Sequence, residues 1–285
     1  WWREVDNWFV DEGFLGFSPN AGLLVRAVTF GQGRALRVAD GEPLFLVHQR
    51  LEQGALDASW SVHAQMAREG EDGRAVLKQL VTGQVIQGVD IESRNLTRMS
   101  LTQDRSAVVI SSCDDDELVV QRWGLEDNDV EVVAEVPGGC ASFAWYPGLA
   151  LSVSQDGSSA VVASHLSGEL IHVDIEGRQW SALAAHERVE TDTDVHLPYG
   201  GVVLDAVIAP SGLMAATSGI DGMVRVWELE GMSLITEFAS RVVALNLDSY
   251  MPSTGSALSW SPDGMLLAHL DEDGDVSVRN TQDWS

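Results

Sequence analysis

Two segments come close to metal-binding motifs, and each lacks a residue that the metal needs. Residues 186–190, HERVE, begin like the H-E-x-x-H motif of zinc hydrolases, but Glu190 replaces the second histidine ligand. Three aspartates alternate as in the first half of a calcium-binding loop: Asp271, Asp273 and Asp275. There the glycine stands at the fourth position instead of the sixth, and Gln282 replaces the bidentate glutamate. We therefore expect no metal site, because ordinary turn chemistry explains these aspartates.

Signals of enzymatic chemistry are equally incomplete. The sequence contains no G-x-S-x-G nucleophile elbow, no G-x-x-x-x-G-K-[ST] phosphate loop and no G-x-G-x-x-G turn after a strand. The seven histidines are scattered, and a structural role is expected for those in strand-like segments, His165, His172 and His269. We expect no catalytic residues and no cofactor, so the protein is predicted not to be an enzyme.

The charge of the chain limits its partners. Acidic residues outnumber Lys and Arg by 43 to 17, the formal charge is −26, and Lys78 is the only lysine. Such a surface repels nucleic-acid phosphates and anionic lipids and favours basic partners. Acidity that serves only solubility is the competing interpretation. No apolar run reaches the roughly 18–20 residues that span a membrane. We therefore expect neither nucleic-acid binding nor a membrane span.

Cys113 and Cys140 are the only cysteines. Two thiols cannot staple a domain of 285 residues, and no C-x-x-C spacing indicates zinc or redox chemistry. The N-terminal residues WWREVDNWFV also lack the layout of a signal peptide. We expect buried free thiols in a reducing compartment, and hence a cytoplasmic protein. A disulfide is the alternative.

A repeated unit must position the candidate residues. Met214–Glu237 reads MAATSGIDGMVRVWELEGMSLITE, in which Asp221-Gly222 joins two alternating strands. Trp260–Ser285 repeats this pattern and contains an S-P-D-G turn directly after Trp260. Weaker copies precede both segments. Strands alternate when one face of each sheet packs on the next, and the turns need glycine for positive φ. A period of about 40–55 residues is typical of propellers and solenoids.

The copies divide the chain into six units. Each unit has an apolar anchor in its first strand: Phe17, Trp60, Leu101, Val153, Val207 and Trp260. The units lie near residues 13–50, 51–93, 94–137, 138–185, 186–240 and 241–285, within one domain, 1–285. The last unit lacks a fourth strand and residues 1–12 are left over. We expect this N-terminal strand to complete the last unit, because closure removes an exposed sheet edge. A seventh unit is the alternative if Ala134–Ala150 contains one.

The chain resembles the WD-repeat family, most clearly over Val202–Ser285. The resemblance implies an all-β fold, a closed β-propeller of four-stranded blades, most simply six, with seven as the alternative. This sequence departs from the family where Glu228 follows Trp227 in place of Asp, and it lacks the Gly-His dipeptide that leads each repeat. The family's side-chain network is therefore complete at most once, through Asp221, His196, Ser218 and Trp227.

In a propeller of this family, the turns between second and third strands share one rim with the connections between blades. Several of these turns are acidic, with Asp114, Asp115, Asp116 and Glu117 in the third unit and Asp271 and Asp273 in the sixth. Tight hairpins use Asp-Gly turns, but three or four acids per turn exceed that need. Three long connections, Pro137–Leu149, Ala185–Gly201 and Ser240–Ser256, add aromatic and acidic residues: Trp145, Tyr146, Asp192, Asp194, Tyr199 and Tyr250. Structural filling is the alternative role for the aromatic residues.

These residues make up the predicted site. We expect a non-catalytic scaffold or recognition module that binds a protein partner, through a basic segment, at the acidic and long-looped rim. The alternative is a sensor or lectin-like propeller that binds a small molecule or sugar by stacking on Trp145, Tyr199 or Tyr250. The sequence leaves open whether the chain works inside a larger complex or polypeptide.

Overall fold

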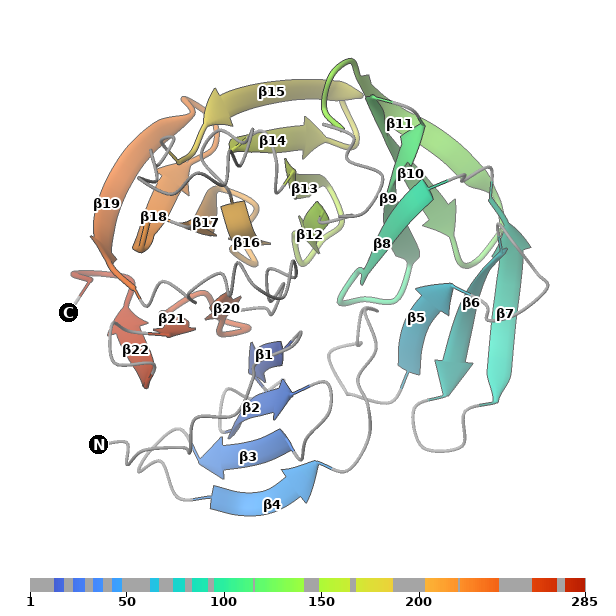
Figure 1. The fold of residues 1–285 in the computed structure, drawn as a ribbon. Coiled ribbons are helices and arrows are strands. Elements are labelled where there is room, and N and C mark those ends of the chain that lie inside the picture. Colours follow the sequence, from blue (N-terminus) through green and yellow to red (C-terminus); the bar gives the residue numbers. More distant parts are fainter. Residues whose placement is uncertain are drawn as a thin grey trace, which may run out of the picture.

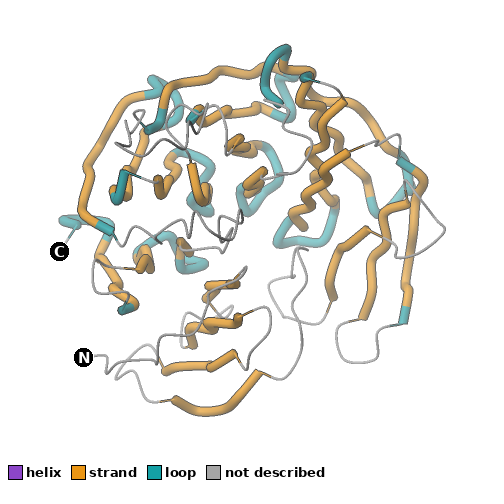
Figure 2. Tube along the Cα trace, in the orientation of Figure 1, coloured by secondary structure: helices purple, strands orange, loops and turns teal. Residues whose placement is uncertain are grey.

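The structure is a computed structural model. It describes residues 13–17, 23–28, 33–37, 43–47, 62–66, 74–79, 84–91, 95–114, 116–140, 149–164, 168–186, 203–219, 221–240, 258–270 and 275–284. Within these ranges every regular element is a β-strand, as Figure 2 shows, so the predicted all-β class is confirmed. No helix in this part of the chain is long and apolar enough to cross a membrane.

The first three sheets are antiparallel and follow one another along the chain. The first sheet contains β1 (Gly13–Phe17), β2 (Leu23–Val28), β3 (Gly33–Arg37) and β4 (Pro43–Val47). The second contains β5 (Val62–Met66), β6 (Arg74–Gln79) and β7 (Val85–Asp90). The third contains β8 (Asn95–Leu101), β9 (Ala107–Asp114), β10 (Glu117–Gly124) and β11 (Val130–Val136).

The last three sheets have the same order of neighbouring strands. The fourth sheet contains β12 (Leu149–Val153), β13 (Ser159–Ser164), β14 (Glu169–Asp174) and β15 (Gln179–Ala184). The fifth contains β16 (Val203–Ile208), β17 (Met214–Gly219), β18 (Met223–Glu228) and β19 (Ser233–Ala239). The sixth contains β20 (Leu258–Trp260), β21 (Leu266–Leu270) and β22 (Val276–Asn280). Each sheet is thus a meander of sequence neighbours.

The sheets stand side by side around a common centre (Figure 1). The first strands β8, β12, β16 and β20 contact one another in succession, and β20 also lies beside β1 of the first sheet. In the second sheet, the chain passes from the end of β7 at Asp90 directly to Asn95, where β8, the first strand of the third sheet, begins. Strand β7 therefore occupies the position of a fourth strand. A Gln87 hydrogen bond to the Leu125 carbonyl, at 3.0 Å, places β7 against the third sheet.

The core lies between neighbouring sheets. Val109 of β9 and Val120 of β10 pack with Val162 of β13 and Ile171 of β14, and all four are fully buried. Similar clusters join the second sheet to the third, the fourth to the fifth and the fifth to the sixth. A single sheet cannot bury both of its apolar faces, so each depends on its neighbours for stability.

Each meander has two ends that carry different connections. At one end, which we call the connection end, the second strand is joined to the third and the chain leaves for the next sheet. The turn end is the one where first and second strands are joined. At the turn end Gly157, Gly212 and Gly264 have φ between 70° and 73°, a conformation that glycine adopts without strain. Arg105 takes the same place in the third sheet with φ 59°.

Most of the predicted anchors lie in first strands. Phe17, Leu101, Val153 and Trp260 end β1, β8, β12 and β20, and Val207 is the residue before the end of β16. Of residues 134–150, 134–136 belong to β11, 137–140 form a turn and 149–150 belong to β12. Trp60 and the closing strand expected in residues 1–12 lie outside the described residues, so closure by that strand stays a prediction.

Candidate functional site

The acidic turn of the third sheet is the part of the predicted site that the structure describes best. Strands β9 and β10 pair in register from Ala107↔Gly124 to Asp114↔Glu117, which leaves Asp115 and Asp116 to connect them. Seven of the eight β9 residues are buried, because β9 lies in the interior of its sheet. Asp114 and Asp116 are exposed and Glu117 is partly buried, while Asp115 lies outside the described residues. The turn therefore projects carboxylates from a rigid, buried hairpin.

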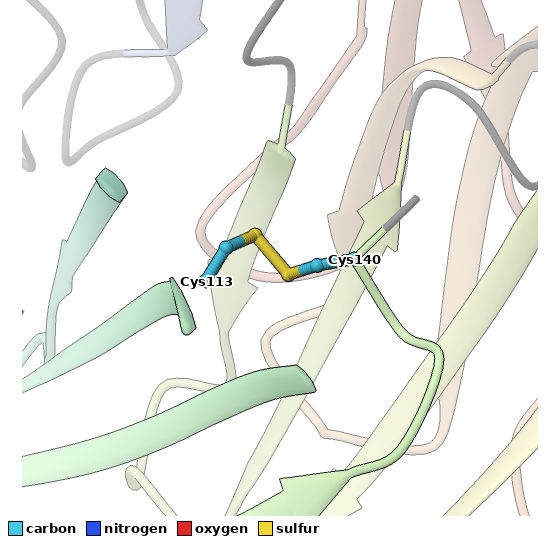
Figure 3. The surroundings of a disulfide bond; sticks show 2 residues. All are labelled: Cys113 and Cys140. Carbon is cyan, nitrogen blue, oxygen red and sulfur yellow. A yellow bond between two sulfur atoms is a disulfide. The ribbon is translucent and has the colours of Figure 1, made fainter. Parts of the chain in front are cut away.

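A disulfide joins Cys113 to Cys140, so the prediction of free thiols was wrong (Figure 3). The two Cα atoms are 5.8 Å apart although 27 residues separate the cysteines along the chain. Cys113 is the residue before Asp114, and Cys140 follows a turn in which the Gly139 N–H donates to the Val136 carbonyl at 3.1 Å. Only pairing of β9, β10 and β11 brings the thiols together, and sequence spacing alone does not show it. The argument from free thiols for a reducing compartment is thereby lost.

A backbone hydrogen bond reinforces the disulfide. The Cys140 N–H donates to the Asp116 carbonyl at 3.0 Å, so the start of the first long connection is tied to the acidic turn twice. Both cysteine side chains are buried. The acidic hairpin, defined as residues 113–118, is consequently fixed relative to the segment that leads out of the sheet.

The hairpin carboxylates make no ion pair within the described part of the chain. Asp114, Asp116 and Glu117 take part in none of the ion pairs that join described residues. Two-residue hairpin connections usually read Asn-Gly or Asp-Gly, since glycine supplies positive φ, but no glycine follows Asp115 here. Turn propensity therefore does not account for this acidic run.

Asp221, at the corresponding turn of the fifth sheet, differs because it is paired. His186 Nδ1 lies 2.9 Å from Asp221 Oδ1, and Arg225 forms an ion pair with the same carboxylate. Burial raises the pKa of Asp221, but the hydrogen bonds and charges of His186 and Arg225 outweigh it and lower the pKa to about 2. This carboxylate is only slightly exposed, and its ion pairs stabilise the fifth sheet.

The side-chain network expected around Asp221 and Trp227 contains two residues other than those predicted. His186 and Thr217 take the positions expected for His196 and Ser218: His186 Nε2 lies 2.9 Å from Thr217 Oγ1, which also accepts the Trp227 Nε1–H at 2.9 Å. Ser218 Oγ is buried and has no hydrogen-bond partner among the described residues, and His196 lies outside them.

The register explains the error. Trp227 pairs with Ala215, so position 217 shares its face of the sheet and position 218 points away. Period-two alternation counted from that pair would have selected Thr217.

Among the described residues, no group of three His, Cys, Asp or Glu side chains is placed to hold a metal ion. The absence of a metal site stays a prediction. His186, from the incomplete zinc motif, is used by the network instead. Asp271 and Asp273 lie outside the described residues, as do the predicted contact residues of the long connections: Trp145, Tyr146, Asp192, Asp194, Tyr199 and Tyr250.

Comparisons with known proteins do not assign the chain. No protein-family model matches the sequence, and no curated protein matches it either.

Proposed function

We propose that the chain is a six-bladed β-propeller of the WD-repeat type that binds a basic segment of a partner protein at the acidic hairpin, without catalysis. Six sheets in succession around one centre support the architecture, and β1 beside β20 brings the first and last sheets together (Figure 1). The network of His186, Asp221, Thr217 and Trp227 supports the likeness to WD repeats.

The binding proposal rests on the fixed position of the acidic hairpin. The Cys113–Cys140 disulfide and the bond from Cys140 to Asp116 hold exposed carboxylates that no described residue neutralises. A ligand that binds a fixed group of charges loses less conformational entropy than one that must order a loop. Fixed charge of one sign also speeds the encounter with a partner of opposite sign.

The net charge of −26 acts in the same direction. It repels anionic partners at long range, and the hairpin would provide local recognition. The remaining acidic and aromatic residues predicted for the connection end would enlarge this surface, and they stay part of the proposal. A basic peptide segment is the partner chemistry that fits.

Charge reversal tests the proposal. Asp114→Arg together with Asp116→Arg should weaken binding of a labelled arginine-rich peptide by about tenfold or more, because it replaces attraction with repulsion. Binding by the unchanged protein should also weaken as salt rises from about 50 to about 300 mM, since exposed charges are screened. Fluorescence anisotropy measures both.

The matched control makes the same change in net charge at the turn end. Glu126 and Glu230 are exposed in turns between third and fourth strands. Glu126→Arg with Glu230→Arg should leave the affinity within about twofold. Equal loss of affinity in both double variants would show that the peptide responds only to net charge and would overturn the proposal. An affinity that does not change with salt would overturn it too.

A further inference from the structure

Five described strands occupy the outermost, fourth position of a sheet: β4, β7, β11, β15 and β19 (Figure 1). Each pairs on one side with a third strand, and no described strand pairs with its other side. A free edge of this kind presents unpaired N–H and C=O groups that can accept another strand. Proteins usually blunt such edges with bulges, charges or proline.

Four of the five edges carry a β-bulge at matching places. The register between third and fourth strands slips by one residue in the first, second, third and fifth sheets, which leaves one residue of each fourth strand unpaired: Leu44, Ile86, Val133 and Ile235. A bulge bends the strand and increases its twist, so a straight partner strand no longer matches it. These four edges are protected.

Strand β15 is the exception. It pairs with β14 without a slip from Asp174↔Gln179 to Glu169↔Ala184. Its sequence, QWSALA, contains neither a charge nor a proline. By contrast, β4 begins with Pro43, and the other three outer strands include acidic residues. The β15 edge therefore has none of the three protections.

The side chains of β15 provide apolar contacts on both faces. Trp180, Ala182 and Ala184 lie on one face and are exposed, and the Trp180 residue keeps 44% of its surface accessible. On the other face Leu183 packs against the core cluster between the fourth and fifth sheets. A strand added to this edge would bury Trp180 and satisfy outward backbone groups together.

The charges around the edge favour a basic ligand. Asp174 and Glu176 are exposed just before β15, and Glu135 is exposed on β11, which lies beside β15. Two nearby cations, Arg178 and Arg122, share the carboxylate of Glu131, so the four carboxylates here outnumber the two guanidinium groups. A second copy of this chain would bring another −26 charges to the same place, which opposes self-pairing.

We propose that the free edge of β15 binds an extended segment of a partner protein with alternating apolar residues and basic ends, by strand addition. This surface is separate from the acidic hairpin and does not depend on the function proposed there. Backbone hydrogen bonds supply affinity in this mode, and alternate side chains supply specificity. Regular register, exposed Trp180 and surrounding carboxylates together select this edge over the other four.

A peptide titration with two variants tests the proposal. The probe is a fluorescein-labelled peptide of alternating valine and threonine with lysines at both ends. Ala182→Lys should weaken its binding by about tenfold or more, because an edge lysine blocks strand addition and repels the basic ends. Leu234→Lys adds the same charge to the bulged strand β19 and should leave the affinity within about twofold. Thermal unfolding verifies that both variants fold.

Backbone chemistry separates strand addition from simple charge attraction. The same peptide with alternate N-methylated amides cannot donate along one edge and should not bind, whereas bound unmodified peptide should slow hydrogen exchange of β15 amides. Equal binding of both peptides, or no effect of Ala182→Lys, overturns the proposal. A dimer in sedimentation that Ala182→Lys dissociates, without peptide binding, overturns it in favour of a second copy. Asp114→Arg with Asp116→Arg should leave β15 protection intact, so failure at one surface is distinguishable from failure at the other.

Discussion

The aspartates at the two ends of the sheets have different hydrogen-bond partners. At the turn end, Asp104, Asp156 and Asp263 stand at the same place in three turns, and each accepts the backbone N–H two residues later at 2.9–3.0 Å. Serine hydroxyls add to this, from Ser154 to Asp156 at 2.7 Å and from Ser261 to Asp263 at 2.6 Å. Hydrogen bonding lowers the pKa of Asp156 and Asp263, and at Asp104 it outweighs the opposing effect of burial to lower that pKa too. These carboxylates hold their own turns.

The acidic hairpin at the connection end has no such bonds among the described residues. Asp114 and Asp116 are exposed, and the disulfide and the Cys140 N–H hold the hairpin in place of carboxylate caps. The number of acids in a turn therefore does not separate the two kinds of turn. The hydrogen-bond partners of each carboxylate separate them. Three experiments test this difference, in order of decreasing effect on stability.

Removal of the disulfide should have the largest effect. Cys113→Ala with Cys140→Ala should lower the free energy of unfolding by about 3.5 kcal/mol, because the crosslink restricts a loop of this length in the unfolded chain. Urea denaturation measures the change. Reduction of the unchanged protein should give a similar loss, and unchanged stability in both cases would show that the disulfide does not hold the hairpin.

Asp221 provides an intermediate case, because its carboxylate lies at the connection end and is paired with His186 and Arg225. Its pKa is about 2 in the folded protein and 3.8 is the ordinary value, so its contribution is present above about pH 4 and is lost as the pH falls toward 2. Asp221→Asn should cost on the order of 2 kcal/mol at pH 7. Urea denaturation across this pH range measures it. The loss relative to the unchanged protein should shrink as the pH falls, and a constant difference would contradict the assignment.

The direct comparison has the smallest expected effects. Asp156→Ala and Asp263→Ala should each lower the free energy of unfolding by about 1 kcal/mol, because each removes hydrogen bonds to a charged acceptor. Asp114→Ala and Asp116→Ala should change it by no more than about 0.5 kcal/mol. Urea denaturation of the four variants gives both values. Equal losses at the two ends would mean that the hairpin acids are also structural.

Local pattern was a good guide to the strands. The alternation predicted on both sides of Asp221-Gly222 matches β17 and β18. Antiparallel meanders pair sequence neighbours, so period-two alternation and turn residues are enough to find them. The acidity of the hairpin was also visible, because it lies in consecutive residues of one turn.

Contacts between distant segments were not visible in the same way. The sequence by itself determined an all-β chain of meanders with acidic turns, because those features depend on residues close together along the chain. The tertiary structure alone decided that Cys113 bonds Cys140 and that His186 rather than His196 completes the network. It also decided that β15 pairs with β14 in unbroken register and has no described strand on its other side. Each of these depends on strand register and on the return path of the chain, which bring together groups up to 35 residues apart.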